Sequence, residues 1–245
     1  MNVAAEAVLI LAGATGAGAG VAALARLPTR DGVCEDLERP RVRRGPPPAQ
    51  FVRLERIVEW ATAAGAETAV DVATGGGHVA RRLREAGLRV VSADPAPGMQ
   101  PDVICRAEDL PFADGAFDLA VTRIAPHHFD DVATAIAELA RVSNDLVVVE
   151  DTLYISELVE EAEKLRDPTH IRSYSEAEWR ELLEAAGLEV EAVELFEKRH
   201  PLDEWLGRAG TPEEDSERVK ELLADLIEDG EFVDEKILLR ARKPA

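Results

Sequence analysis

The stretch AVDVATGGGHVARRL, residues 69–83, joins an apolar run to three consecutive glycines and then to an arginine-rich helical pattern. A continuous apolar run such as TAVDVA, residues 68–73, is typical of a parallel strand that is covered on both faces. The glycines at 75–77 let the backbone turn sharply and let a ligand approach main-chain N–H groups, before a helix that we expect to begin near residue 78. The stretch therefore predicts a strand, a ligand-binding loop and a helix, as in an α/β fold.

The next apolar segment supplies an acidic residue at a useful distance from the glycines. The segment LRVVSAD, residues 88–94, reads as a second strand that ends in Asp94. A carboxylate about 20 residues after such a glycine loop lies at the tip of the neighbouring strand and can accept hydrogen bonds from ribose hydroxyl groups. Asp71 stands inside the first strand, where the NAD-binding pattern usually has an apolar residue. The spacing predicts a nucleoside site, and Asp71 distinguishes it from the usual NAD pattern.

Composition limits the classes of function. The chain has 245 residues, which fits one α/β domain with appendages. Its 48 acidic and 28 basic residues give a formal charge of -20, which repels a phosphate backbone, so nucleic acid is not an expected partner. Cys34 and Cys105 provide neither a disulfide framework nor a cysteine metal site, and no metal is expected. We expect a cytoplasmic protein, and the sequence leaves its oligomeric state open.

The first 48 residues differ from the rest of the chain. Residues 7–25 carry no charge and approach the length of a membrane span, but small residues dominate them and no Lys or Arg precedes them, which disfavours a membrane anchor. The stretch VLILAGATGAGAG, residues 8–20, has glycines for a dinucleotide loop, but charged and proline-rich residues follow it instead of a second strand. We interpret residues 1–48 as an Ala/Gly-rich extension with a proline-rich linker, followed by one domain over residues 49–245.

Further segments, in a fixed order, point to a family. They are VDVATGGGHVA (residues 70–80), VVSADPAPGM (90–99), AEDLPFADGAFDLAVTR (107–123) and HHFDDVATAIAELARV (127–142). With them the chain resembles, over about residues 50–190, the class I S-adenosylmethionine-dependent methyltransferases, and within these the type 11 subgroup typified by ubiquinone and menaquinone biosynthesis enzymes. The resemblance implies a Rossmann-like, doubly wound α/β fold with a mostly parallel seven-stranded sheet and a terminal antiparallel strand. It also implies S-adenosylmethionine as the cofactor and methyl transfer to carbon or oxygen of a small-molecule acceptor.

The resemblance assigns a part of the cofactor to each of several residues. Asp71 would pair with the ammonium group of the methionine end, directly or through water, and the glycine loop and Arg123 would line the same end. The residues that follow the second and third strands would hold the ribose and the adenine. The implied cofactor-binding residues are Asp71, Ala73, Thr74, Gly75, Gly77 and Arg123 at the methionine, Asp94 at the ribose, and Pro95, Met99, Ala107 and Glu108 around the adenine.

Structural roles compete with these functional ones. Asp71 can be an ordinary strand-end acid, and Arg123 can be a surface salt-bridge partner. His127 and His128 are the candidate catalytic residues, because either can adjoin the acceptor and serve as a base, but a structural or helix-capping role is the alternative. The loop RDPTHIRSYS, residues 166–175, is a candidate for binding an anionic or aromatic substrate. The alternative is that it is only a polar loop that closes on the sheet. Its candidate residues are Arg166, His170, Arg172 and Tyr174.

Three departures from the family affect the expected cofactor site. Ala73 stands where the family usually has glycine, which is tolerable if the backbone there has an ordinary conformation. About nine residues follow Asp94 before the third strand, fewer than a parallel crossover generally needs, so we expect either an extended loop or a rudimentary strand. Arg106 replaces an acidic residue. These changes keep open a cofactor-binding regulatory protein without turnover, and the glycines at 8–20 keep open an NAD(P)-dependent oxidoreductase.

The carboxyl-terminal third predicts the rest of the fold. Ser175, with Glu178 three residues later, forms a capping-box pattern at the start of a helix. The segment LEVEAVELF alternates apolar and charged residues as a half-solvated strand does. A helical insertion at about residues 200–230 precedes a last strand, EKILLRAR, which would complete the antiparallel pair.

Overall fold

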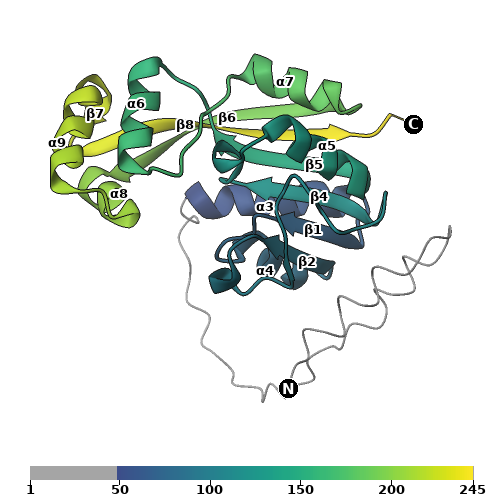
Figure 1. Cartoon of the computed structure of the whole chain (residues 1–245). Helices are drawn as coiled ribbons and strands as arrows, with labels where there is room; N and C mark the ends of the chain where they lie inside the picture. Colours follow the sequence, from purple (N-terminus) through teal and green to yellow (C-terminus); the bar gives the residue numbers. More distant parts are fainter. Residues whose placement is uncertain (1–48, 245) are drawn as a thin grey trace, which may run out of the picture.

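The computed structural model of the chain describes residues 49–244 (Figure 1). The predicted extension over residues 1–48, with its glycine stretch and prolines, lies outside the described residues. Among the helices between residues 49 and 244, none has the length and apolar character needed to cross a membrane.

A twisted sheet forms the centre of the molecule. Its strands follow the order β3-β2-β1-β4-β5-β8-β6, and the first five are parallel, whereas β8 runs antiparallel to both of its neighbours. This confirms the predicted mostly parallel, Rossmann-like sheet, and a short strand, β7, adds to it by pairing with β8 alone. The strands are β1 Thr68–Val72, β2 Arg89–Asp94, β3 Val103–Ile104, β4 Phe117–Arg123, β5 Ser143–Thr152, β6 Glu189–Pro201, β7 Ile227–Glu228 and β8 Glu231–Arg242.

Helices cover both faces of the sheet. On one face α3 and α4 bury side chains such as Ile57 and Leu83 against Val121 of β4, and on the other α5 and α7 bury Leu139 and Trp179. The interiors of the parallel strands are therefore mostly apolar, since both faces are covered. The helices are α3 Ala49–Ala63, α4 His78–Glu85, α5 Val132–Val142, α6 Glu157–Arg166, α7 Glu176–Ala185, α8 Leu202–Ala209 and α9 Glu213–Leu222, with short 3₁₀ turns η1 Pro97–Met99, η2 Pro126–His128 and η3 Ala224–Leu226.

Local signals that the sequence carries are realised at two junctions. Ser175 caps α7 by accepting a hydrogen bond from the Glu178 backbone N–H, and the Glu178 carboxylate accepts from Ser175, so the predicted capping box is confirmed. After β2 the chain makes the single turn η1 and then the two-residue strand β3. The short connection after Asp94 thus leads to a rudimentary third strand, one of the two predicted outcomes.

The strands β6 and β8 continue beyond the end of β5 and carry a second, smaller core. Strand β5 stops where Thr152 pairs with Lys236, whereas β6 and β8 remain paired out to Pro201 and Glu231. Helices α6, α8 and α9 pack around this extension, as Figure 1 shows at the end of β8 that also carries β7. We call this part the satellite cluster; its buried residues are Val159, Ala162, Leu202, Trp205, Leu206, Val219, Leu223 and Phe232.

Candidate functional site

A cavity of about 180 Å³ lies beside the glycine loop, at the carboxyl ends of β1 and β4. This is the edge where open α/β sheets bind ligands. We call it the loop cavity. The residues that line it are Asp71, Ala73, Thr74, Gly75, Gly76, His78, Val79, Arg123 and Ile124.

Asp71 is the buried acidic group of the loop cavity, with only 1% of its surface exposed. Its Oδ2 accepts hydrogen bonds from the Thr74 hydroxyl at 2.6 Å and from the Ala80 backbone N–H at 3.0 Å. Burial raises the pKa of Asp71 to about 6, although these hydrogen bonds and the charge of Arg123 act in the opposite direction. Asp71 is therefore mostly ionised at neutral pH and is suited to hold a cationic group.

Arg123 is fixed by a buried carboxylate. Its Nε donates to Glu150 Oε2 at 2.6 Å, and Glu150 is 1% exposed. Arg53, on α3, lies 3.6 Å from the other oxygen of Glu150. The Arg123 pair is therefore not a surface salt bridge, and the guanidinium group stays at the wall of the loop cavity.

The backbone of the glycine loop takes a conformation that usually needs glycine. Ala73, Gly75 and Gly77 have φ values of 55°, 50° and 69°. Left-handed φ values cost a residue with a Cβ about 1–2 kcal/mol. The condition under which Ala73 would be tolerated without cost, an ordinary backbone conformation, is therefore not met, and its conformation gives the physical reason for a glycine at this position.

Asp94 supports the loop rather than lining the cavity. One carboxylate oxygen accepts from the Gly75 backbone N–H at 2.9 Å and the other from the Ala96 backbone N–H at 2.9 Å. Gly77 begins α4 as its N-cap. Asp94 and Gly77 therefore support the conformation of the loop, and neither is part of the cavity wall.

The residues predicted around the adenine lie outside the loop cavity, in the segments that follow β2 and β3. Pro95 and Met99 are exposed, and Met99 shows 53% of its surface. Ala107 is buried in the main core. Glu108 accepts from the Arg106 guanidinium and from the Asp131 backbone N–H, both at 3.3 Å. Their roles toward a nucleoside remain predictions.

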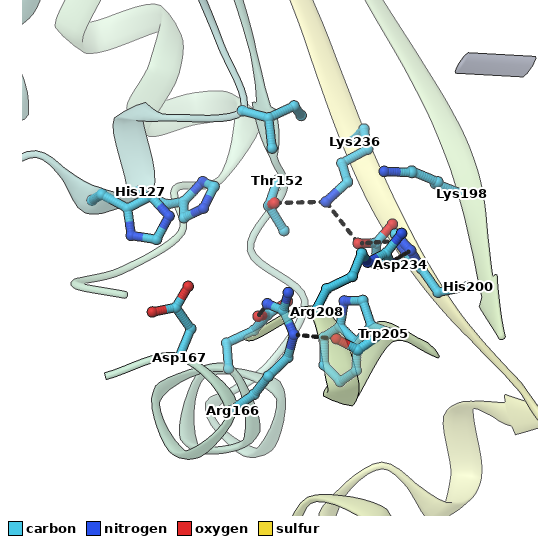
Figure 2. A pocket seen from close by; sticks show the side chains of 13 residues that line it. His127, Thr152, Arg166, Asp167, Lys198, His200, Trp205, Arg208, Asp234 and Lys236 are labelled. Carbon is cyan, nitrogen blue, oxygen red and sulfur yellow. Dashed lines mark hydrogen bonds and ion pairs between the residues drawn. The ribbon is translucent and has the colours of Figure 1, made fainter. Parts of the chain in front are cut away.

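A second cavity, of about 300 Å³, lies between the sheet edge and the satellite cluster (Figure 2). We call it the polar cavity. Ile124 lines both cavities, so the two adjoin. Ile124 has φ of 51°, a rare value for a β-branched residue and of the kind found at functional sites. The polar cavity is lined by Ile124, His127, His128, Thr152, Glu163, Arg166, Asp167, Lys198, His200, Trp205, Arg208, Asp234 and Lys236.

His127 and Asp151 form a buried pair at this cavity. His127 Nδ1 lies 2.5 Å from Asp151 Oδ1, and Asp151 is fully buried at the end of β5. Because Asp151 occupies Nδ1, Nε2 is the ring nitrogen left for proton transfer. Such an arrangement fixes the orientation and the tautomer of the imidazole.

His128 is placed differently. Its ring lies 4.1 Å from that of His127, and its Nδ1 is 3.0 Å from the Thr169 carbonyl oxygen. Burial, and then the neighbouring His127, lower the pKa of His128. The geometry therefore favours His127 over His128 as the base, and the catalytic role itself stays a prediction.

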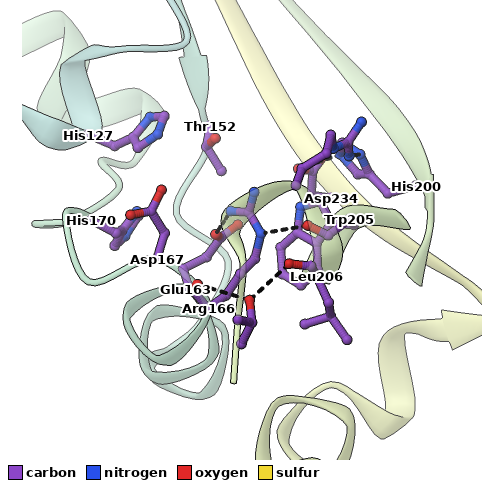
Figure 3. A network of polar contacts seen from close by, with 12 residues as sticks. His127, Thr152, Glu163, Arg166, Asp167, His170, His200, Trp205, Leu206 and Asp234 are labelled. Atoms are coloured by element: carbon purple, nitrogen blue, oxygen red, sulfur yellow. Dashed lines mark hydrogen bonds and ion pairs between the residues drawn. The ribbon is translucent and has the colours of Figure 1, made fainter. Parts of the chain in front are cut away.

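The predicted substrate loop divides between two places. Arg166 lines the polar cavity, where Glu163 pairs with it at 2.9 Å and the Trp205 ring lies beneath it (Figure 3). Arg172 instead pairs with Glu178 and stacks on Tyr174. His170 stacks 5.3 Å from His127 and contacts Glu160. Only Arg166 of the four candidates lies at the wall of the cavity.

Most of the polar cavity was not predicted from sequence. Asp151 and Thr152 end a strand that was expected, but their position beside His127 depends on the pairing of β4 with β5. On β6 and β8, consecutive polar residues at the strand ends, Glu197–His200 and Asp234–Lys236, were the available signal. The residues missed are Asp151, Thr152, Glu163, Asp167, Lys198, His200, Trp205, Arg208, Asp234 and Lys236.

Comparisons with known proteins agree with the geometry. The methyltransferase domain family matches residues 70–149. The uncharacterized methyltransferase YcgJ of Bacillus subtilis is 35% identical over 128 residues, which are 49% of this chain and 49% of the relative, so the alignment spans about half of that protein. The uncharacterized protein YafE of Escherichia coli is 34% identical over 158 residues, which cover 57% of this chain and 75% of YafE.

Solved structures extend the likeness to the whole described fold. The crystal structure of a candidate methyltransferase from Bacillus halodurans is 28% identical and superposes with a TM-score of 0.72, over 79% of this chain and 100% of that one. The sheet order, the glycine loop after β1 and the aligned sequences all agree. The chain belongs to the class I S-adenosylmethionine-dependent methyltransferases, in the type 11 group.

Proposed function

We propose that this protein transfers the methyl group of S-adenosylmethionine to a carbon or oxygen atom of a small molecule. The loop cavity takes the methionine end of the cofactor, and the polar cavity takes the acceptor. The observation that carries the proposal is that the two cavities adjoin at Ile124, with the buried Asp71 on one side and the His127–Asp151 pair on the other.

The residues of the loop cavity fit the cofactor. Asp71 supplies a buried carboxylate for the ammonium group, and Thr74 and the Ala80 backbone N–H hold that carboxylate in place. Arg123 ends β4, the strand paired with β1, and is suited to the methionine carboxylate, because charge-assisted pairs of this kind are the strong ones. Asp94 fixes the loop through Gly75 and, at the neighbouring strand tip, is the group expected to bind the ribose.

The chemistry needs little beyond orientation and one proton acceptor. When bound, S-adenosylmethionine supplies a methyl group that its sulfonium centre has already activated. The walls of the polar cavity orient the acceptor, and orientation of this kind can be worth about 7–11 kcal/mol of the barrier. His127 Nε2 takes the proton of the nucleophile, and Asp151 stabilises the imidazolium that forms.

Calorimetry tests the cofactor assignment first. Purified protein is titrated in parallel with S-adenosylmethionine, S-adenosylhomocysteine and NAD. We expect micromolar binding of the first two and none of NAD. Asp94→Ala is expected to weaken binding about 10- to 100-fold, at about 1.4 kcal/mol per decade. Asp114→Ala, which removes an exposed carboxylate paired with Arg141, is the matched control and leaves affinity unchanged.

Two outcomes would overturn the proposal. Binding of NAD alone would favour the oxidoreductase. Binding of S-adenosylmethionine without production of S-adenosylhomocysteine across a broad acceptor panel would favour the regulatory protein. Where turnover is found, His127→Asn is expected to reduce it by about 10²- to 10⁴-fold. The same variant leaves affinity for S-adenosylhomocysteine unchanged, because His127 does not line the loop cavity.

A further inference from the structure

The polar cavity collects cationic side chains in a protein whose formal charge is -20. Four cations and three carboxylates line it, and a further carboxylate, Asp151, pairs with His127 of the same wall. The cations are Arg166, Lys198, Arg208 and Lys236, and the carboxylates are Glu163, Asp167 and Asp234.

Two of the four cations have carboxylate partners. Lys236 pairs with Asp234 at 2.6 Å, and Arg166 pairs with Glu163 at 2.9 Å. Among the carboxylates between residues 49 and 244, none forms a salt bridge with Lys198 or Arg208. These two side chains are therefore the cations of the cavity wall that no described carboxylate neutralises directly.

A hydrogen-bond network fixes the position of Arg208 in the wall of the polar cavity. The Arg208 guanidinium donates to His200 Nδ1 at 2.9 Å, and His200 Nε2 donates to Asp234 Oδ2 at 3.1 Å (Figure 2). This arrangement requires neutral His200, and burial lowers the pKa of that residue. Because Asp234 already pairs with Lys236, it does not neutralise Lys198 fully.

Lys198 is the cation of the cavity wall whose pKa is lowered by its surroundings. Burial, and then the charge of Lys236, lower the pKa of Lys198 to about 8, and Arg123 and Arg208 add to the effect. A cation held in this way is stabilised by any anion that enters the cavity, since an opposite charge at close range favours the charged form.

Lys198 and Arg208 are placed to bind the end of an acceptor that lies farthest from the His127 base. In Figure 2, Lys198 and His200 lie on the side of the cavity away from His127. An acceptor anchored beside Lys198 would place its other end toward His127 and Ile124, where the loop cavity begins.

We propose that the methyl acceptor carries a single carboxylate, bound by Lys198 and Arg208. This inference rests on the proposed function, because it takes the polar cavity as the acceptor site. Lys198 and Arg208, which form no salt bridge with a described carboxylate, are the two cations of the wall available to pair with a carboxylate. A phosphate dianion carries more negative charge, so the carboxylates on the same walls would repel it more strongly.

The test uses benzoate as the probe, with benzamide as its neutral counterpart. We expect saturable binding of benzoate, measured by calorimetry, and none of benzamide. Lys198→Met and Arg208→Met remove a charge each and keep much of the side-chain length, and each is expected to weaken benzoate binding about tenfold or more. Lys220→Met, on the exposed face of α9, is the matched control and leaves binding unchanged.

Proton uptake gives a second readout that a merely structural lysine would not produce. At pH 8 Lys198 is about half protonated, since its pKa is about 8. A bound carboxylate raises that pKa, so benzoate binding takes up a fraction of a proton. The uptake appears as a dependence of the binding enthalpy on the ionisation enthalpy of the buffer, and Lys198→Met abolishes it.

The same proteins are titrated with S-adenosylhomocysteine to separate the two proposals. The carboxylate site is overturned if S-adenosylhomocysteine binds but benzoate does not, or if folded Lys198→Met binds benzoate as tightly as the unaltered protein. The proposed function fails if S-adenosylhomocysteine does not bind, whatever benzoate does. Thermal melting confirms that each variant is folded.

Discussion

Asp71 is a residue whose protonation should control cofactor binding. Its pKa is raised to about 6, so it loses its negative charge as the pH falls through that value. The ligand ammonium stays protonated throughout this pH range, so its own charge does not change. The affinity for S-adenosylhomocysteine is therefore expected to be near its highest value at pH 7 and to fall about tenfold per pH unit below pH 6. Calorimetry between pH 5 and pH 7 measures this change.

The amide variant provides the control for this pH dependence. Asp71→Asn removes the charge and keeps the size of the side chain, so its affinity is expected to be lower and flat over the same pH range. A flat profile in the unaltered protein would show that the ammonium pairs with another group.

Ala73 gives a second prediction at the level of one residue. Its φ of 55° is unfavourable for a residue with a Cβ. Ala73→Gly is expected to leave the free energy of unfolding unchanged or to raise it by up to about 1 kcal/mol, because relief of this strain offsets the greater chain entropy of glycine. Urea unfolding measures the change.

Ala80→Gly serves as the control for Ala73→Gly. Ala80 is buried within α4, where glycine is expected to cost about 1 kcal/mol. Equal losses in the two variants would show that the conformation of Ala73 carries no strain.

At the scale of elements, the satellite cluster builds one cavity and not the other. Helices α6 and α8, with the ends of β6 and β8, supply most of the polar cavity, whereas the loop cavity uses β1, α4 and β4.

Leu223→Ala, in the satellite cluster, is expected to destabilise this cluster by about 2–5 kcal/mol. Benzoate binding should weaken while affinity for S-adenosylhomocysteine is kept.

Leu139→Ala is the matched substitution in the main core, where α5 packs on the sheet. Both leucines are fully buried, so the packing lost is comparable. Leu139→Ala is expected to lower the midpoint of global urea unfolding. A parallel loss of both ligands in Leu223→Ala would contradict the division into two structural parts.

The elements themselves were largely predictable. Hydrophobic periodicity, the glycine loop and the capping box at Ser175 are local, and each appears where the sequence indicated. The strands β6 and β8 were placed correctly, but each is longer than expected, because the satellite helices cover their ends. Strand β7 has two residues and only one partner, and nothing in its own sequence marks it.

At the scale of the whole molecule, the two cavities differ in how far the sequence reveals them. The loop cavity comes mostly from one short segment, so a local motif identifies Asp71 and its neighbours. The polar cavity joins Thr152 of β5 to Lys236 of β8, which are far apart in the chain and adjacent in the sheet. Such a site depends on the order and register of the strands, which local patterns in a single sequence do not reveal.

The distribution of both cavities along the chain gives a last prediction. Among residues 49–244, those that line the two cavities lie from Asp71 to Lys236. Deletion of residues 1–45 is therefore expected to leave the affinity for S-adenosylhomocysteine unchanged within about twofold, by calorimetry on the full and the shortened chain. The oxidoreductase alternative, which uses the glycines at 8–20, requires instead that the deletion abolish NAD binding. A loss of S-adenosylhomocysteine affinity at unchanged melting temperature would place part of the cofactor site in the deleted residues.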